Sequence, residues 1–221
     1  MSLRARMAIS DLLFGVQIAG ALLLCAVQFL RLIETTQGQL LSMYVCIEAY
    51  LCFNLMLALD AHRVRSGRVI RQALWTYAIW LVLIAFDIAA FVINGSYQWN
   101  ENDTRTAIFV TLGVVLICVA TNSRNIGLED PMIKSLLAML FKALPQFAVA
   151  VEIEQEGGHG VPGLAIIVGN LTILIRIGQI LFAACETGWN RNLAWLCASE
   201  TVNEVSWAVV SIVWLIWHLT P

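Results

Sequence analysis

The sequence consists of seven stretches of predominantly apolar residues joined by short polar connections. A bilayer core takes about 20 apolar helical residues to cross. Of the 221 residues, 60% are hydrophobic and 13% are charged, about half the charge of a typical soluble domain. We therefore predict an all-α membrane protein with seven transmembrane helices. The predicted spans are 7–30, 40–59, 72–93, 106–120, 135–151, 161–185 and 202–219.

The fourth stretch is the shortest of the seven. Only 15 residues lie between Arg105 and the polar run that begins at Thr121. A short hydrophobic stretch is accommodated by a thinner bilayer or by flanking polar residues. We therefore expect a thin or tilted span at 106–120.

Basic residues are distributed unevenly between the two sides of the predicted membrane. Nine lie on the side of the N-terminus and the even-numbered connections, whereas Arg31 and Arg105 lie on the other side. The positive-inside rule therefore predicts a cytoplasmic N-terminus and a C-terminus outside. With 13 Lys+Arg against 15 Asp+Glu and no polybasic tract, we expect no nucleic-acid binding. The nine are Arg4, Arg6, Arg63, Arg65, Arg68, Arg71, Arg124, Lys134 and Arg191.

An internal repeat relates the first and fifth stretches and the helices that follow them. Gln28 and Gln146 are 118 residues apart, and Asn54 and Asn170, each within the next predicted helix, are 116 apart. The second copy begins four helices after the first, an even step, so the copies run parallel. We predict two parallel three-helix units, 1–94 and 135–221, joined by a linker helix with its flanking loops at 95–134.

Short motifs accompany the repeat. The second unit contains Pro145-Gln146, and the first has Val27 before Gln28, followed by Gln-x-x-Arg at 28–31 and Thr-x-x-Gly-x-x-x-Ser at 35–42. In these motifs the chain resembles the PQ-loop membrane proteins, which include SWEET and SemiSWEET sugar transporters, cystinosin-like amino-acid exporters and the KDEL receptor. Two features depart from that family. The first proline is missing, and the predicted orientation is opposite to that of SWEET transporters and the KDEL receptor.

The resemblance implies a transporter or permease for a small polar solute, such as a sugar, an amino acid or a small carboxylate. It would work by alternating access and would be coupled to protons if buried carboxylates take part. The alternative is a non-transporting seven-helix receptor or membrane assembly factor of the same architecture. The expected partners are the solute and the lipid bilayer, and a homo-oligomer remains an open alternative.

Ionisable residues within spans are costly, so each is a candidate for function. We expect Arg176 and Glu48 to form an interior pair that binds substrate. The alternative is that Arg176 only snorkels or holds helices together. Asp87, Glu48 and Glu204 are candidates for proton coupling. Asp87 could equally form a helix-packing hydrogen bond, and Glu204 could belong to a solvated helix start.

Amides and tryptophans form a second set of candidates. Asn54 and Asn170 could bind substrate hydroxyl or amino-acid groups, although such amides also form bonds between helices. Trp80 and Trp207 lie in the third helix of each unit and could form an aromatic platform for a sugar ring. Tryptophans are also common at membrane interfaces, which is the competing interpretation.

Four residues are assigned to the motif and to hinges: Gln28, Pro145, Gln146 and Pro162. Pro145 within a helix frees a backbone carbonyl and favours a kink. The connection before Pro162 is rich in glycine.

An enzyme is not expected. The three histidines lie at predicted span ends or in a loop, and no paired catalytic motif is present. The six cysteines form no CxxC pair, so we expect neither a metal site nor a cofactor.

Overall fold

The computed structural model describes residues 3–64 and 67–220, with side chains from residue 8 onward except those of residues 10 and 69. All regular structure in these residues is helical, and seven helices are long and apolar enough to cross a membrane. This agrees with the predicted class and number of spans. Segments α5, η1 and α6 form one continuous span, called here the α5–α6 rod. The elements are α1 (Leu3–Glu34), α2 (Leu41–Val64), α3 (Arg68–Asn94), α4 (Glu101–Arg124), α5 (Pro131–Ala138), η1 (Met139–Ala143), α6 (Leu144–Glu156), α7 (Gly163–Thr187) and α8 (Arg191–Leu219).

Helix α4 is longer than predicted. It has 24 residues, so the expectation of a short span at 106–120 is wrong. Its start is fixed by a capping box, in which Asn100 accepts a hydrogen bond from the Asp103 backbone and Asp103 accepts one from the Asn100 backbone. At the other end, Thr121 and Arg124 remain helical. Polar residues that cap or extend a helix cannot be told from a connection by hydropathy alone.

Helix α8 also begins earlier than predicted, at Arg191 and not at Val202. The Asn190 side chain accepts a hydrogen bond from the Leu193 backbone at 3.0 Å and caps the helix. Residues 191–201 are polar enough to resemble a connection, yet Ser199 and Glu200 are buried inside the bundle. This difference of eleven residues matters for the functional site.

The α5–α6 rod contains a π-helical turn just before Pro145. The Leu144 backbone N–H donates to the Met139 carbonyl, five residues earlier. Proline has no backbone N–H and cannot continue the regular i to i−4 pattern, so the predicted disruption at Pro145 occurs as this turn. Lys142 lies within it.

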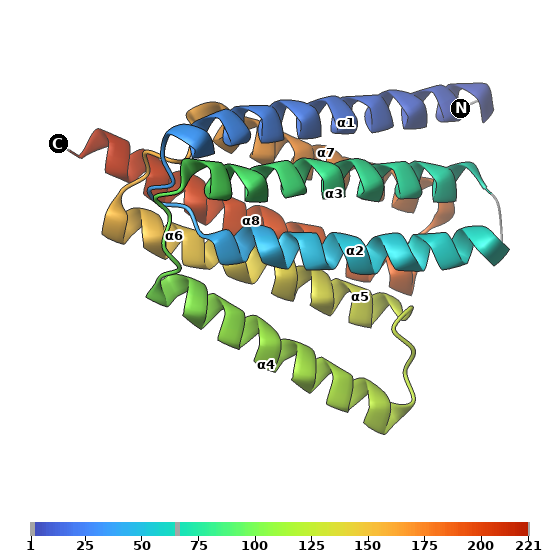
Figure 1. Cartoon of the computed structure of the whole chain (residues 1–221). Helices are drawn as coiled ribbons and strands as arrows, with labels where there is room; N and C mark the ends of the chain where they lie inside the picture. Colours follow the sequence, from blue (N-terminus) through green and yellow to red (C-terminus); the bar gives the residue numbers. More distant parts are fainter. Residues whose placement is uncertain (1–2, 65–66, 221) are drawn as a thin grey trace.

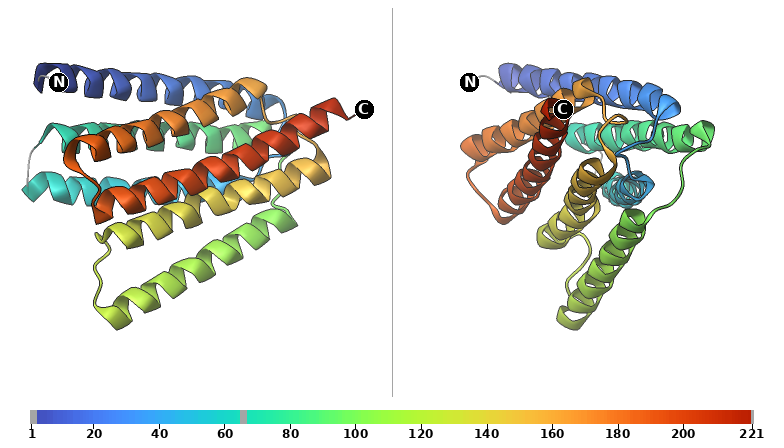
Figure 2. Two further views of the ribbon diagram at one scale, coloured as in Figure 1. Left: turned by 180° about the vertical axis from the view of Figure 1, so that it is seen from behind. Right: turned by 90° about the vertical axis from the view of Figure 1, so that its left-hand side faces the viewer.

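The helices pack in a regular pattern (Figures 1 and 2). Helix α3 packs against both α1 and α2, and α8 packs against both the rod and α7. Helix α1 also packs against α7, while α2 packs against the rod. Helix α4 lies at the edge of the bundle, against α2 and the rod, as Figure 2 shows from the end.

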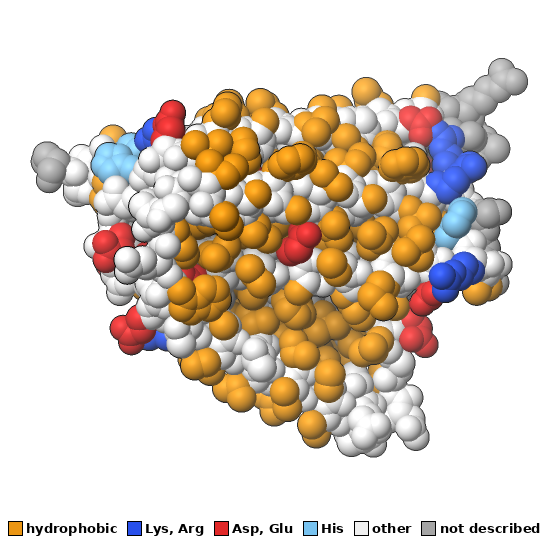
Figure 3. Space-filling model, viewed as in Figure 1, with side chains coloured by type: hydrophobic (Ala, Val, Ile, Leu, Met, Phe, Trp, Pro, Cys, Tyr) orange, Lys and Arg blue, Asp and Glu red, His pale blue; other side chains and the backbone are white. Residues whose placement is uncertain are grey.

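The two termini lie at opposite ends of the bundle (Figure 1). We call them the N-terminal end, which also holds the connections after α2, α4 and α7, and the C-terminal end, which holds those after α1, α3 and the rod. Charged side chains gather at both ends, and the face between them is mostly apolar apart from an acidic patch near its middle (Figure 3). Of the basic residues used to predict orientation, Arg65 lies outside the described residues, as do the side chains of Arg4 and Arg6.

The most deeply buried apolar residues gather toward the C-terminal end. Leu32, Leu40 and Ile153 are fully buried and belong to one hydrophobic cluster with Tyr44 and Phe91. These residues lie at or near helix ends that meet there. Close packing at this end contrasts with a large cavity toward the other.

Candidate functional site

A cavity of about 830 Å³ lies between α1, α2 and α3 on one side and the rod, α7 and α8 on the other. Its lining, within the described residues, comes from every span except α4. At the N-terminal end the lining includes Glu186 and Thr187, which are exposed. Toward the C-terminal end it includes Gln28 and Asp87, which are buried. The cavity is therefore open at the N-terminal end and closed toward the other.

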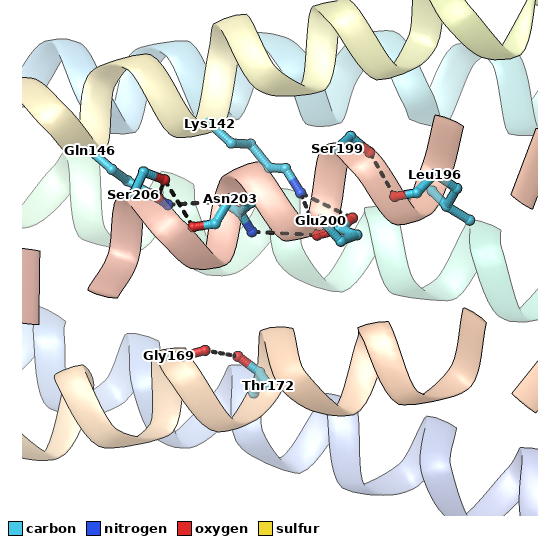
Figure 4. Close-up of polar contacts among 9 residues, drawn as sticks. All are labelled: Lys142, Gln146, Gly169, Thr172, Leu196, Ser199, Glu200, Asn203 and Ser206. Carbon is cyan, nitrogen blue, oxygen red and sulfur yellow. Dashed lines mark hydrogen bonds and ion pairs between the residues drawn. The ribbon is translucent and has the colours of Figure 1, made fainter. Parts of the chain in front are cut away.

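An ion pair lies on the cavity wall within the membrane-spanning part (Figure 4). The Lys142 Nζ atom is 3.2 Å from Oε1 and 3.1 Å from Oε2 of Glu200, so both carboxylate oxygens accept from one ammonium. The same Nζ lies 5.6 Å from the centre of the Tyr50 ring. The π-helical turn of the rod carries the lysine, and the unpredicted first part of α8 carries the glutamate.

A chain of hydrogen bonds connects this ion pair to Gln146 (Figure 4). The Asn203 amide donates to Glu200 at 3.4 Å, and the Gln146 amide donates to the Asn203 side-chain oxygen at 3.1 Å. The Ser206 hydroxyl is within hydrogen-bonding distance of the Gln146 oxygen, at 2.5 Å. Gln146, Asn203 and Ser206 are all buried, so this network ties the rod to α8.

Arg176 lines the cavity but does not pair with Glu48. Its Nη1 donates to the Gln179 side-chain oxygen at 3.0 Å, and it interacts electrostatically with Glu200. Glu48 does not line the cavity, and its buried Oε2 atom has no hydrogen-bond partner among the described residues. Since Ile47 does line the cavity, the predicted pair fails because α2 is rotated so that Glu48 lies on another face.

Asp87 lies at the closed end of the cavity. It is 0% exposed, and neither carboxylate oxygen has a hydrogen-bond partner among the described residues. Cys25 and Tyr44 lie close enough to interact with it electrostatically. Glu204 is not part of the cavity wall, so of the three proton-coupling candidates only Asp87 lies there.

The paired asparagines do not face the cavity. The Asn54 amide donates to the Tyr50 carbonyl at 2.8 Å, and the Asn170 amide donates to the Ile166 carbonyl at 2.7 Å, each within its own helix. Asn170 also donates to Ser211 of α8 at 2.9 Å. Of the two, Asn170 makes a bond between helices, which was the alternative role, whereas the bond of the Asn54 amide stays within its own helix.

Trp80 and Trp207 both line the cavity. The Trp207 indole donates to the Ile166 carbonyl at 3.2 Å and packs directly over Gly169, where any side chain would collide with the indole. Trp207 is thus held firmly against α7.

The two connections that resemble each other in sequence are bonded together at the C-terminal end. The Gly160 N–H donates to the Gln37 carbonyl at 2.8 Å, and the Gly160 carbonyl accepts from the side chains of Gln28 and Gln39, each at 3.1 Å. The Arg31 guanidinium donates to the His159 carbonyl at 2.6 Å. These contacts close the end of the bundle opposite the cavity mouth.

Glycine is required where these connections meet. Gly38 and Gly157 have φ of +77° and +92°, which L side chains rarely adopt. A Cβ at Gly38 would also collide with the Gly157 carbonyl oxygen. Pro162 follows, and its carbonyl accepts from Ala165 at 2.9 Å at the start of α7.

The paired glutamines differ in surroundings. Gln28 lies six residues before the end of α1 and bonds to a connection, whereas Gln146 lies ten residues before the end of the rod and bonds to α8. The repeat in sequence therefore does not give these two residues equivalent contacts.

A buried carboxylate also braces the start of α4 near the closed end. Asp103 is 0% exposed and accepts hydrogen bonds from the Ser42 backbone at 2.8 Å and from the Tyr97 hydroxyl. Tyr97 lies in the connection between α3 and α4 and also accepts from the Leu41 backbone at 3.0 Å. Burial, together with the bond to Asp103, raises the pKa of the Tyr97 hydroxyl above its usual range.

Sequence reasoning missed the Lys142–Glu200 pair. Glu200 was assigned to a connection because α8 was predicted to begin at Val202. The signal that could have found it was Lys142 itself, since a lysine within a span needs an acidic partner at similar depth.

Within the described residues, no group of three or more His, Cys, Asp or Glu side chains could hold a metal ion. The cavity wall offers an ion pair, hydrogen-bonding groups and aromatic side chains. No protein-family model, curated protein or solved structure matches this chain.

Proposed function

We propose that this chain is a membrane transporter of a small polar solute that works by alternating access. The observation that carries the proposal is the cavity of about 830 Å³, open at one end and closed at the other. Ligand sites of small molecules typically measure about 300–1,000 Å³. Charged residues on its wall, including Arg176, suit a polar solute better than a lipid.

The packing supports a 3+1+3 arrangement. The first helix group consists of α1, α2 and α3, and the second consists of the rod, α7 and α8. In this comparison α1 corresponds to the rod, α2 to α7 and α3 to α8. The contact of α1 with α7 then corresponds to the contact of the rod with α2, and both contacts are present. Likewise, α3 packs on α1 and α2 as α8 packs on the rod and α7. Helix α4 is the linker, and a PQ-loop relationship is part of the same proposal.

The contacts at the C-terminal end are suited to act as a gate. The bonds from Arg31 to His159 and from Gln28 to Gly160 join the two helix groups directly. Rocking one group against the other would break them and open the cavity on this side. By the positive-inside rule, the present form would be open to the cytoplasm.

Uptake into proteoliposomes tests the proposal. We expect protein-dependent uptake or counterflow of at least one labelled solute from a panel of sugars, amino acids and carboxylates, compared with protein-free vesicles. Ala73→Trp, which fills the cavity mouth, should abolish that uptake. Val82→Trp, on the exposed face of the same helix, should leave it near the wild-type level.

Two outcomes would contradict the proposal that solute is transported through this cavity. Saturable binding of a solute without any net flux would favour the receptor or assembly factor. Equal uptake by the Ala73→Trp and Val82→Trp variants would show that the cavity is not the route.

A further inference from the structure

The charges at the centre of the cavity do not balance. Lys142 and Arg176 supply two cations, and Glu200 supplies one carboxylate that interacts with both. Glu200 accepts from Lys142 through both oxygens and from Asn203 through one of them. The centre therefore carries one excess positive charge within a membrane-spanning bundle, where an uncompensated charge is costly.

The excess charge resides on Arg176. A guanidinium has five N–H donors in a planar fork. The hydrogen bond described for Arg176 goes to the neutral Gln179 amide at 3.0 Å, so several donors remain for a ligand. Tyr50 and Tyr77, two further lining residues, lie close enough for the charge of the guanidinium to act on their hydroxyl groups.

The other charged lining residues lie away from this centre. Asp87 is at the closed end, where it interacts with Cys25 and Tyr44. Arg68 lies near the mouth and pairs with Asp11 of α1. Glu186 is also at the mouth and is exposed. The imbalance at the centre is thus left for a ligand to compensate.

We infer that the cavity binds a small organic monocarboxylate with an apolar body, anchored by the Arg176 guanidinium. A planar carboxylate can accept two parallel hydrogen bonds from a guanidinium, and one negative charge matches the excess. Beyond Arg176 the wall offers Ile47, Leu51 and Ile173, which suit an apolar body. The inference rests on the proposed function because it assigns the solute class to the same cavity.

Thermal unfolding of the detergent-purified protein at pH 7.5 tests the inference with benzoate and its uncharged isostere benzamide. Benzoate should raise the melting temperature in a saturable manner, and benzamide should not. Arg176→Gln should weaken benzoate binding about ten- to hundred-fold, the loss expected for one charge-assisted hydrogen bond or pair. Arg124→Gln is the matched control, because Arg124 is exposed on α4 away from the cavity.

Several results would overturn the inference. These are equal stabilisation by benzamide, unchanged benzoate binding in Arg176→Gln, or stronger stabilisation by succinate, inorganic phosphate or glucose than by benzoate. If Arg176→Gln does not fold, Arg176→Lys replaces it, with weakened benzoate binding expected and unchanged binding contradicting the inference. Flux of a neutral sugar without carboxylate binding would leave transport standing and remove this inference. Arg176-dependent benzoate binding without flux would support this inference and contradict transport.

Discussion

The two ends of the bundle are held together in different ways. At the C-terminal end, connections from both helix groups are bonded to each other, for example by the backbone hydrogen bond from Gly160 to Gln37 at 2.8 Å. At the N-terminal end, Asp11 bonds to Gln72 at 3.0 Å and also pairs with Arg68, contacts between helices of one group. The two helix groups are therefore bonded to each other at the C-terminal end, whereas the cavity separates them toward the N-terminal end.

Substitutions in the ion pair of the cavity wall should cause the largest loss of stability. Lys142→Met removes the cation paired with Glu200, whose side chain is only 11% exposed, and leaves a carboxylate without its nearest partner. We expect the free energy of unfolding to fall by about 3 kcal/mol, the lower part of the range for breaking a buried pair, because the cavity admits water. Unfolding with increasing SDS in mixed micelles measures this loss.

The double variant Lys142→Met with Glu200→Gln is the control, because it removes both charges. It should recover most of the lost stability. Equal losses in the single and double variants would show that packing, and not the ion pair, is responsible.

The second-largest loss of stability is expected from substitutions of glycines at the closed end. Gly38→Ala places a side chain at positive φ and against the Gly157 carbonyl, so we expect a loss of about 2–4 kcal/mol in the free energy of unfolding. Gly188→Ala is the matched control, since Gly188 has nearly the same φ of +78° and open space around it. It should cost only about 1 kcal/mol. Equal effects would contradict the tight contact between the connections.

A pH-dependent prediction concerns Tyr97 at the same end. Tyr97→Phe loses its bond to Asp103, and we expect it to be about 1–2 kcal/mol less stable than wild type at pH 8. A raised pKa in the folded state means that the wild-type advantage is complete below the unfolded pKa of about 10 and is lost as pH rises beyond it. Melting temperatures of both proteins from pH 8 to pH 11 should therefore converge. A difference in melting temperature that stays constant from pH 8 to pH 11 would contradict the stabilising bond between the Tyr97 hydroxyl and Asp103.

The sequence was sufficient to predict the number of spans, because only helices satisfy the backbone of a single apolar segment inside lipid. It failed where polar residues are helical. The segment 191–201 and the end of α4 look like connections in a hydropathy profile, but they form capped helix. Membrane proteins that enclose a cavity place polar residues within spans, and this weakens the boundary signal.

The site was predicted less well for a geometric reason. Successive residues of a helix point about 100° apart, and a single sequence does not fix the rotation of each helix. Ile47 lines the cavity while its neighbour Glu48 does not, and Asn203 lines it while Glu204 does not. The cavity wall does include Arg176 and Asp87, which the sequence singles out because ionisable groups within spans are rare.

The smallest expected effect separates the two asparagines paired by the repeat. Asn170→Ala removes a bond between α7 and Ser211 of α8, and interhelical hydrogen bonds in membranes average about 0.6 kcal/mol. Asn54→Ala removes only a bond to its own helix, at Tyr50, so its cost should be smaller still. Because neither residue lines the cavity, both variants should bind solute as wild type does. Weakened binding in either, measured in the same thermal-unfolding assay, would show that an amide faces the cavity in another state of the transport cycle.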